Sequence, residues 1–217
     1  MSNPYFQFKQ FTVWHDKCAM KVGTDGVLLG AWTSVQGAHS ILDVGTGTGL
    51  VALMLAQRSL PNTNIVALEI DEAAAEQAKE NIVRSPWKKQ IEVVQTDFRK
   101  YQSPEKFDVI VSNPPYFVDS LGCPDQQRNS ARHNDSLTYE ELLEGVTGLL
   151  TENGTFTIVI PMDVADRVKM IASEKKLQAV RQLNVITKPG GIPKRTLITF
   201  SFSNQECIVE ELLTEVA

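Results

Sequence analysis

The sequence has few of the residues that cross-link or anchor a chain. It contains three cysteines, Cys18, Cys123 and Cys207, at wide spacings and with no CxxC pair. This odd count argues against a disulfide framework and a zinc site, and the three histidines show no ligand spacing. No run approaches the roughly 18 apolar residues of a membrane span, and residues 1–10 lack a signal peptide's apolar region. We therefore expect a soluble, cytoplasmic protein without metal.

An excess of positive charge is also lacking. Lys and Arg number 21 and Asp and Glu 26, which gives a net charge of −5 over 217 residues. At face value that counts against a nucleic-acid-binding protein, but the charge is unevenly distributed. Residues 164–204 carry eight basic and two acidic residues, and the last 13 residues carry four acidic ones. The first of these segments predicts a local basic footprint on an acidic body.

From residue 40 onward, short apolar runs alternate with helical patterns. Strands are predicted over 41–44, 65–69, 91–96, 107–112, 155–160, 180–187 and 195–203, and helices over 50–58, 72–83, 138–150 and 164–175. This alternation predicts an α/β fold, a mostly parallel seven-stranded sheet with helices on both faces. Because no helix separates the last two strands, we expect them to pair antiparallel at one edge. Ligands of such sheets bind at the carboxyl ends of the strands.

The first motif is a glycine-rich turn, Asp43-Val44-Gly45-Thr46-Gly47-Thr48-Gly49, between a strand and a helix. Glycines let the backbone turn tightly and approach a ligand, and the helix N-terminus offers free N–H groups. The G-x-G-x-G spacing is shorter than the G-x-G-x-x-G of dinucleotide folds. It suits a nucleoside without a pyrophosphate, although an ordinary strand-to-helix turn is the alternative.

Carboxylates follow the next two strands. Glu69 ends the second strand, 20 residues after Gly49, where an acid can accept from both ribose hydroxyls. Asp71 and Glu72 are better placed to cap the next helix. Asp97 follows the third strand and could accept from an adenine amino group while Phe98 packs on the base. A simple turn residue is the alternative for Asp97.

The most specific motif is Asn113-Pro114-Pro115-Tyr116 after the fourth strand. The two prolines fix the backbone, so that the Asn113 side-chain oxygen and the Pro114 carbonyl can both accept from one planar NH₂ group. Tyr116 can stack on the planar substrate. Since an exocyclic amine is weakly basic, acceptors and positioning matter more than a strong base.

Taken together, these four features resemble class I S-adenosylmethionine-dependent methyltransferases that act on amino or amide nitrogen, over residues 20–160. The resemblance implies a Rossmann-like fold, S-adenosylmethionine as cofactor and S-adenosylhomocysteine as product. It implies catalytic roles for Asn113, Pro114, Pro115 and Tyr116, with Asn113 also beside the cofactor. It implies that the cofactor's methionine part meets Gly45, Gly47, Gly49 and Asp43, its ribose Glu69, and its adenine Asp97 and Phe98.

The N-terminal segment 21–32 reads as an N-cap residue, Thr24 or Asp25, followed by an amphipathic helix. It is similar to the arm of the bacterial tRNA adenine-N6 methyltransferase family that modifies adenine 37 of a valine tRNA. Residues 85–87, 131–132 and 193–197 match that family as well. In the family this segment closes over the cofactor, so Lys21, Thr24 and Asp25 become cofactor-binding candidates. The expected organisation is an arm and lid helix over 1–38 and a methyltransferase domain over 39–217.

The main hypothesis is methyl transfer to adenine N6 in tRNA by a monomer. The RNA-binding candidates flank the Gly/Pro loop or could extend its basic patch: Lys188, Lys194, Arg195, Arg132 and Lys9. One alternative is a sister enzyme that methylates a release-factor glutamine amide or guanine N2 in ribosomal RNA. Others are a non-catalytic binding module and a nicotinamide enzyme on a related sheet.

Overall fold

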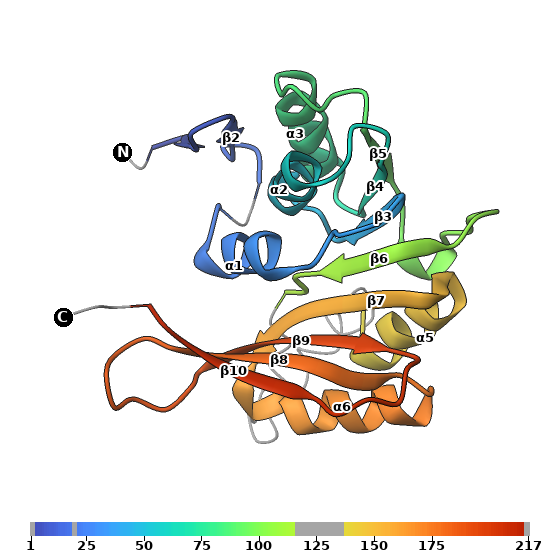
Figure 1. Cartoon of the computed structure of the whole chain (residues 1–217). Coiled ribbons are helices and arrows are strands. Elements are labelled where there is room, and N and C mark those ends of the chain that lie inside the picture. Colours follow the sequence, from blue (N-terminus) through green and yellow to red (C-terminus); the bar gives the residue numbers. More distant parts are fainter. Residues whose placement is uncertain (1–2, 19–20, 116–136, 215–217) are drawn as a thin grey trace, which may run out of the picture.

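An eight-stranded sheet forms the centre of the fold. The structure, a computed structural model, describes residues 3–18, 21–115 and 137–214. The strand order is β10-β8-β9-β7-β6-β3-β4-β5, and only β9 runs antiparallel to its neighbours (Figure 1). The strands are β3 (Ser40–Val44), β4 (Asn64–Glu69), β5 (Ile91–Gln95), β6 (Phe107–Ser112), β7 (Leu150–Pro161), β8 (Gln178–Ile186), β9 (Arg195–Ser201) and β10 (Ile208–Leu213).

Helices cover both faces of the sheet (Figure 1). One face carries α1 (Thr24–Trp32), α2 (Leu50–Arg58) and α3 (Glu72–Val83), and the other carries α5 (Tyr139–Leu149) and α6 (Ala165–Glu174). The short 3₁₀ helices η1 (Phe98–Lys100) and η2 (Met162–Val164) follow β5 and β7. A separate antiparallel ribbon, β1 (Tyr5–Gln7) with β2 (Thr12–Trp14), packs beside α3. The predicted mostly parallel α/β architecture is confirmed.

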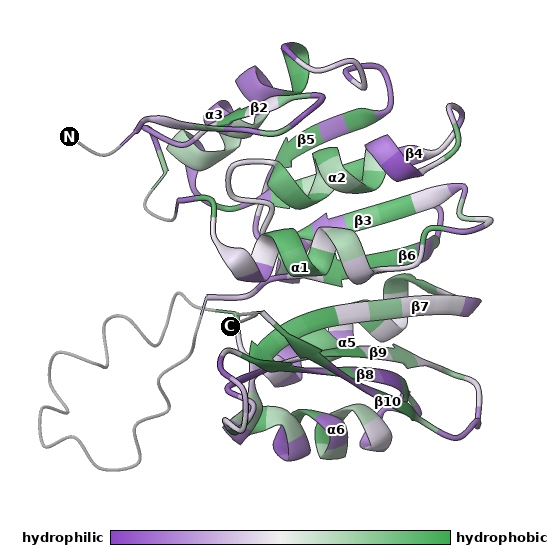
Figure 2. Cartoon of the chain, turned by 60° about the vertical axis from the view of Figure 1, so that its left-hand side comes forward, coloured by the Kyte–Doolittle hydropathy of each residue, from purple (hydrophilic) through white to green (hydrophobic). Residues whose placement is uncertain are grey.

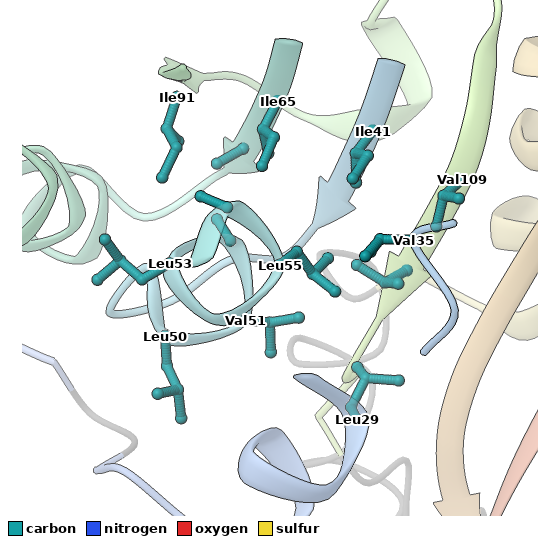
Figure 3. Packing of buried hydrophobic residues seen from close by; sticks show 14 of the residues in the cluster. Leu29, Val35, Ile41, Leu50, Val51, Leu53, Leu55, Ile65, Ile91 and Val109 are labelled. Atoms are coloured by element: carbon teal, nitrogen blue, oxygen red, sulfur yellow. The ribbon is translucent and has the colours of Figure 1, made fainter. Parts of the chain in front are cut away.

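Two hydrophobic clusters hold these layers together. In Figure 3, Leu53, Leu55 and Val51 of α2 lie between α1 and the strands that carry Ile41 and Ile65. Because both faces of β3 and β6 are buried, these strands are apolar along most of their length, as their colouring shows (Figure 2). Each fully buried Leu or Ile contributes roughly 1.5–3 kcal/mol, so this packing fixes the strand ends that form the site.

The sheet differs from the prediction at its C-terminal edge. We expected seven strands and placed residues 205–217 after the last one. Instead Ile208–Leu213 forms β10, parallel to β8, and its Leu212 packs against the core. In addition, the antiparallel β9 lies inside the sheet, between β7 and β8, and not at its edge. The acidic residues around the apolar ones hid this strand.

Two local expectations were also wrong. The strand predicted over 155–160 starts earlier, because β7 begins at Leu150 and runs through Asn153 and Gly154. Helix α1 has Gly23, not Thr24 or Asp25, as its N-cap. It is also not simply amphipathic, because it packs against both α2 and β7.

Glycines let α1 approach α2 closely. A Cβ on Gly30 would lie 2.7 Å from Met54 Sδ and 2.8 Å from Met54 Cβ, and one on Gly26 would lie 3.1 Å from Leu50 Cδ2. These two glycines are about one helical turn apart, so the face of α1 toward α2 has no side chain at either position. The Met54 Cβ is fixed to the backbone and cannot move aside without a shift of the helix.

We expect Gly30→Ala to destabilise the protein by about 1–3 kcal/mol, since the added methyl overpacks the α1–α2 contact. Urea unfolding measures this effect. Gly148→Ala in α5 is the matched control, because a Cβ there meets no described atom within 4 Å. It should be neutral or stabilising by up to about 1 kcal/mol. Equal effects of the two substitutions would contradict the close packing of α1.

No helix in the described part of the chain is both long and apolar enough to cross a membrane. Among the same residues, no group of three or more His, Cys, Asp and Glu side chains could hold a metal ion.

Candidate functional site

A pocket of about 780 Å³ lies at the carboxyl ends of β3, β4, β5 and β6. Its walls come from the Gly45–Thr48 turn, the ends of β4 and β5, residues 112–115 and the start of α1. Ligand pockets span roughly 300–1,000 Å³, so the space suffices for a nucleoside cofactor. The parallel topology brings these segments together because all four strands end at the same edge.

The glycine turn has the conformation that its sequence predicts. Gly45, Gly47 and Gly49 have φ of 74°, 55° and 81°, values that residues with a Cβ rarely adopt. A Cβ on Gly45 or Gly47 would meet no described atom within 4 Å, so the backbone there borders open space. A Cβ on Gly49 would instead lie 3.4 Å from Ala78 Cβ, and Gly49 is the N-cap of α2. The backbone of Gly45 and Gly47 is therefore accessible to a ligand in the pocket.

Glu69 organises this end of the pocket. Its Oε2 accepts from Gly47 N at 2.8 Å, and its Oε1 accepts from the main-chain N–H groups of Ile70 and Asp71 at 2.9 and 3.0 Å. The carboxylate is 9% exposed and lines the pocket. A carboxylate has about four acceptor sites, so it keeps capacity for a ligand hydroxyl. As expected, Asp71 caps α3 by accepting from Ala74 N.

The structure places Asp43 behind the glycine turn. Its side chain is 1% exposed, accepts from Thr46 Oγ1 at 2.6 Å, and is not among the described residues that line the pocket. Burial raises the pKa of this carboxyl to about 7, although hydrogen bonds from Thr46 and the Ala52 main chain oppose the rise. Asp43 thus supports the turn from beneath, and its predicted contact with the cofactor's amino group stays a prediction.

The raised pKa of Asp43 predicts a pH-dependent stability. The carboxyl ionises near pH 3.8 in the unfolded chain and near 7 in the folded one, so the folded state binds more protons in between. The contribution of Asp43 to the free energy of unfolding therefore falls as pH rises through this window. We expect the wild-type value minus that of Asp43→Asn to drop by roughly a few kcal/mol from pH 4 to pH 7 in denaturant titrations. A difference that is constant with pH would contradict this assignment.

Asp97 and Phe98 follow β5 and line the pocket. Asp97 accepts from Arg99 N at 3.0 Å, and its two oxygens pair with the Arg99 guanidinium at 2.8–3.0 Å. Arg99 thereby lowers the pKa of Asp97. Phe98 is 7% exposed and packs against Gly145 of α5. The two predicted adenine contacts border the pocket, with Asp97 held in place by Arg99.

The Asn113-Pro114-Pro115 segment begins where β6 ends. Ser112 Oγ donates to Val44 O at 2.9 Å, and this bond ties the ends of β6 and β3 together. Asn113 is half-buried and lines the pocket with both prolines. Its Nδ2 lies 3.8 Å from the Cβ position of Gly26, so α1 packs directly over this amide. Tyr116 lies outside the described residues.

The start of α1 closes one side of the pocket, where Lys21, Thr24 and Asp25 all line it. Arg195, predicted as an RNA contact, also lines the pocket, and its Nε donates to Asp25 Oδ2 at 3.3 Å. This ion pair joins α1 to β9 at the pocket wall. Arg195 reaches the pocket because the reversed β9 starts opposite Pro161 at the end of β7.

The other RNA-binding candidates are spread over the surface. Lys188 and Lys194 are exposed on the loop between β8 and β9, at the pocket edge of the sheet. Lys9 is exposed in the turn between β1 and β2. Arg132 lies outside the described residues. The two loop lysines are therefore the best placed of the set.

The structure adds pocket residues that the motifs did not single out. Ile70 is 56% exposed and lines the pocket. In the sequence it could have been found as an apolar residue between two acidic ones, Glu69 and Asp71. Cys18 lines the same region, where burial and nearby carboxylates raise the pKa of its thiol to about 11. At neutral pH this cysteine is therefore a protonated, unreactive thiol.

Comparisons with known proteins agree with this geometry. The family model of the methyltransferase small domain matches residues 22–187. A Bacteroides thetaiotaomicron protein named tRNA1(Val) (adenine(37)-N6)-methyltransferase is 81% identical over the whole of this chain and 92% of its own length. The chain belongs to the tRNA1(Val) (adenine(37)-N6)-methyltransferase family. A Yersinia pestis member is 44% identical over 95% of this chain and 84% of its own length.

Solved structures extend the likeness of this methyltransferase to fold level. TrmN from Thermus thermophilus has a TM-score of 0.62 at 20% identity and covers 86% of this chain and 52% of its own. The glycopeptide N-methyltransferase MtfA in complex with S-adenosylmethionine has a TM-score of 0.61 at 12% identity over 83% of this chain and 93% of its own. At these identities the likeness concerns the fold alone. The resemblance deduced from the motifs is confirmed at the level of the family.

Proposed function

We propose that this methyltransferase moves the methyl group of S-adenosylmethionine to the N6 amine of an adenine in tRNA, the reaction in its relatives' printed names. One observation carries the proposal. The Asn113-Pro114-Pro115 segment and the bare glycine turn face the same pocket. The pocket can therefore hold a nucleoside cofactor beside a planar amine. The bound cofactor supplies an electrophilic methyl group on a sulfonium.

Asn113 and Pro114 orient the amine. The side-chain oxygen of Asn113 and the carbonyl of Pro114 accept its two hydrogens, and this directs the nitrogen lone pair away from them. With the cofactor bound, this orientation would direct the lone pair toward the methyl carbon, and the amine would lose one proton to water after the transfer. The segment thus acts by position and by its two acceptors, without a strong base.

Glu69, Asp97 and Ile70 give the cofactor its place. In this proposal Glu69 holds the ribose hydroxyls, while Asp97 and Ile70 border the adenine. The three main-chain bonds of Glu69 link ribose binding to the shape of the glycine turn. A side chain on Gly45 or Gly47 would point into open space, and in this proposal that space holds the methionine part of the cofactor.

Parallel incubations with labelled S-adenosylmethionine test the proposal against its sister reactions. Total tRNA, a release factor and ribosomal RNA are offered separately to the same enzyme. We expect label in tRNA alone. Label in the release factor or in ribosomal RNA, with unmodified tRNA, would overturn the proposal.

The exposed lysines of the β8–β9 loop predict a salt-dependent contribution to tRNA binding. If Lys188 and Lys194 each contact a phosphate, Lys188→Ala/Lys194→Ala should weaken binding and reduce the slope of log affinity against log salt by about 2. Lys106→Ala is the matched control, since Lys106 is exposed just before β6, at the other edge of the sheet. Filter binding at several salt concentrations measures both. An unchanged slope in the double variant would place the footprint elsewhere.

A further inference from the structure

We propose that Ile192, on the loop between β8 and β9, inserts into the tRNA base stack beside the target adenine and fills the gap that this base leaves. Ile192 is then a positioning residue for methyl transfer. The inference rests on the proposed function, because an adenine in a stacked loop must leave its stack to reach Asn113. Four features of this loop carry the inference.

The first feature is exposure. Ile192 is 80% exposed, the highest value among the large apolar side chains that the structure describes. Scattered exposed apolar residues are ordinary on protein surfaces. Here, however, the apolar residue stands between Lys188 and Lys194, two exposed cations on the same short loop. An apolar tip flanked by positive charge is suited to a ligand with phosphates outside and stacked bases inside.

The second feature is a tight turn that directly precedes Ile192 and leaves its side chain exposed. Gly191 N donates to Lys188 O at 2.9 Å, with Pro189 and Gly190 between them and φ of 73° at Gly190. That is the pattern of a type II turn. A Cβ on Gly191 would lie 3.0 Å from Lys188 O, so a side chain at this position would crowd the turn.

The third feature is the anchoring of the loop on its other side. Pro193 follows Ile192 and restricts it to extended backbone conformations. Lys194 N donates to Val185 O at 3.3 Å, and Met162 N donates to Lys194 O at 3.1 Å. The loop backbone is thus fixed on both sides of Ile192, so little backbone entropy is left to lose on binding.

The fourth feature is position. Arg195 lines the pocket and lies three residues after Ile192, a chain distance of at most about 11 Å. Since Arg195 pairs with Pro161 and Lys194 bonds to Val185, the loop leaves the sheet at the edge where the pocket lies. Figure 1 shows this loop extending beyond that edge, on the same side as α1.

These features match the energetic need of base extrusion. Unstacking a base costs a few kcal/mol, and proteins that distort nucleic acids often offset it with an apolar wedge of Ile, Leu, Met or Phe. The wedge occupies the vacated space and keeps the extruded base from returning. An isoleucine has no polar group, so it adds no sequence preference of its own.

A valine tRNA transcript with 2-aminopurine in place of the target adenine tests the inference. This base fluoresces more strongly when unstacked and lacks the N6 amine, so it reports extrusion without reaction. Wild-type enzyme should raise the fluorescence, Ile192→Ala should lose most of the increase, and Ile192→Leu should retain it. Ile208→Ala is the matched control, because Ile208 is 62% exposed at the other end of the sheet.

Methyl transfer to unmodified tRNA is measured in parallel. We expect Ile192→Ala to lower kcat/KM about tenfold, with tRNA affinity within about twofold of wild type. Wild-type fluorescence with Ile192→Ala, or slower transfer without a loss of fluorescence, would overturn the wedge. A wild-type enzyme that methylates no tRNA would instead reject the proposed function, so the two failures are distinguishable.

Discussion

Asn113→Ala is expected to lower kcat for methyl transfer by about 10²–10³-fold or more, with the affinity for S-adenosylhomocysteine nearly unchanged. Asn113 directly follows β6, whose last residue Ser112 is bonded to Val44, and in the proposed mechanism it holds the amine rather than the body of the cofactor. Removing its side chain leaves the nitrogen lone pair undirected while the glycine turn and Glu69 remain. Single-turnover assays measure transfer, and titration calorimetry measures the product's affinity.

The matched control for this variant is Asn153→Ala. Asn153 is exposed near the start of β7, at the other edge of the sheet from the pocket, so the same substitution there should leave both quantities unchanged. Asn113→Ala with normal turnover would contradict the mechanism. A fall in affinity as large as the fall in rate would mean that Asn113 serves the cofactor instead.

Glu69→Ala is expected to weaken S-adenosylhomocysteine binding by about 100-fold or more, because two losses add. The ribose hydroxyls lose their carboxylate partner, a charge-assisted interaction of about 1.5–3 kcal/mol. In addition, the N–H groups of Gly47, Ile70 and Asp71 lose their acceptor, so the turn that borders the pocket loosens. The free protein should therefore also melt at a lower temperature.

Thermal shift with and without S-adenosylhomocysteine separates these two effects. The melting temperature of the free variant reports the turn, and the ligand-induced shift reports binding. Glu72→Ala is the matched control, since Glu72 is exposed in the first turn of α3, close in sequence but not among the described residues that line the pocket. A Glu69→Ala protein with the wild-type ligand-induced shift would refute the ribose assignment.

Much of this site could be predicted because, in a parallel sheet, the residues that follow each strand all lie at the same edge. Glu69, Asp97 and Asn113 each follow a separate apolar run, so alternation alone brings them to one edge. The glycine turn was equally predictable, since Gly45, Gly47 and Gly49 all adopt positive φ. These features depend on residues that are close together in the sequence and on the repeated alternation of strands and helices.

What escaped prediction depends on long-range packing. Arg195 reaches the pocket because β9 is reversed, and Ile208–Leu213 becomes a strand because β8 offers it an edge. Asp43 lies beneath the turn because its side chain accepts a hydrogen bond from Thr46. The spacing of the motif residues does not reveal this partner. Gly23 caps α1 although Thr24 and Asp25 are better capping residues by type.

Mass spectrometry of nucleosides tests the central claim most directly. Total tRNA is incubated with the enzyme and S-adenosylmethionine, single isoacceptors are isolated, and each is digested. The account predicts N6-methyladenosine in one valine isoacceptor, absent when Asn113→Ala replaces the wild-type enzyme. Methylated protein with unmodified tRNA, or a methylated nucleoside other than N6-methyladenosine, would contradict it.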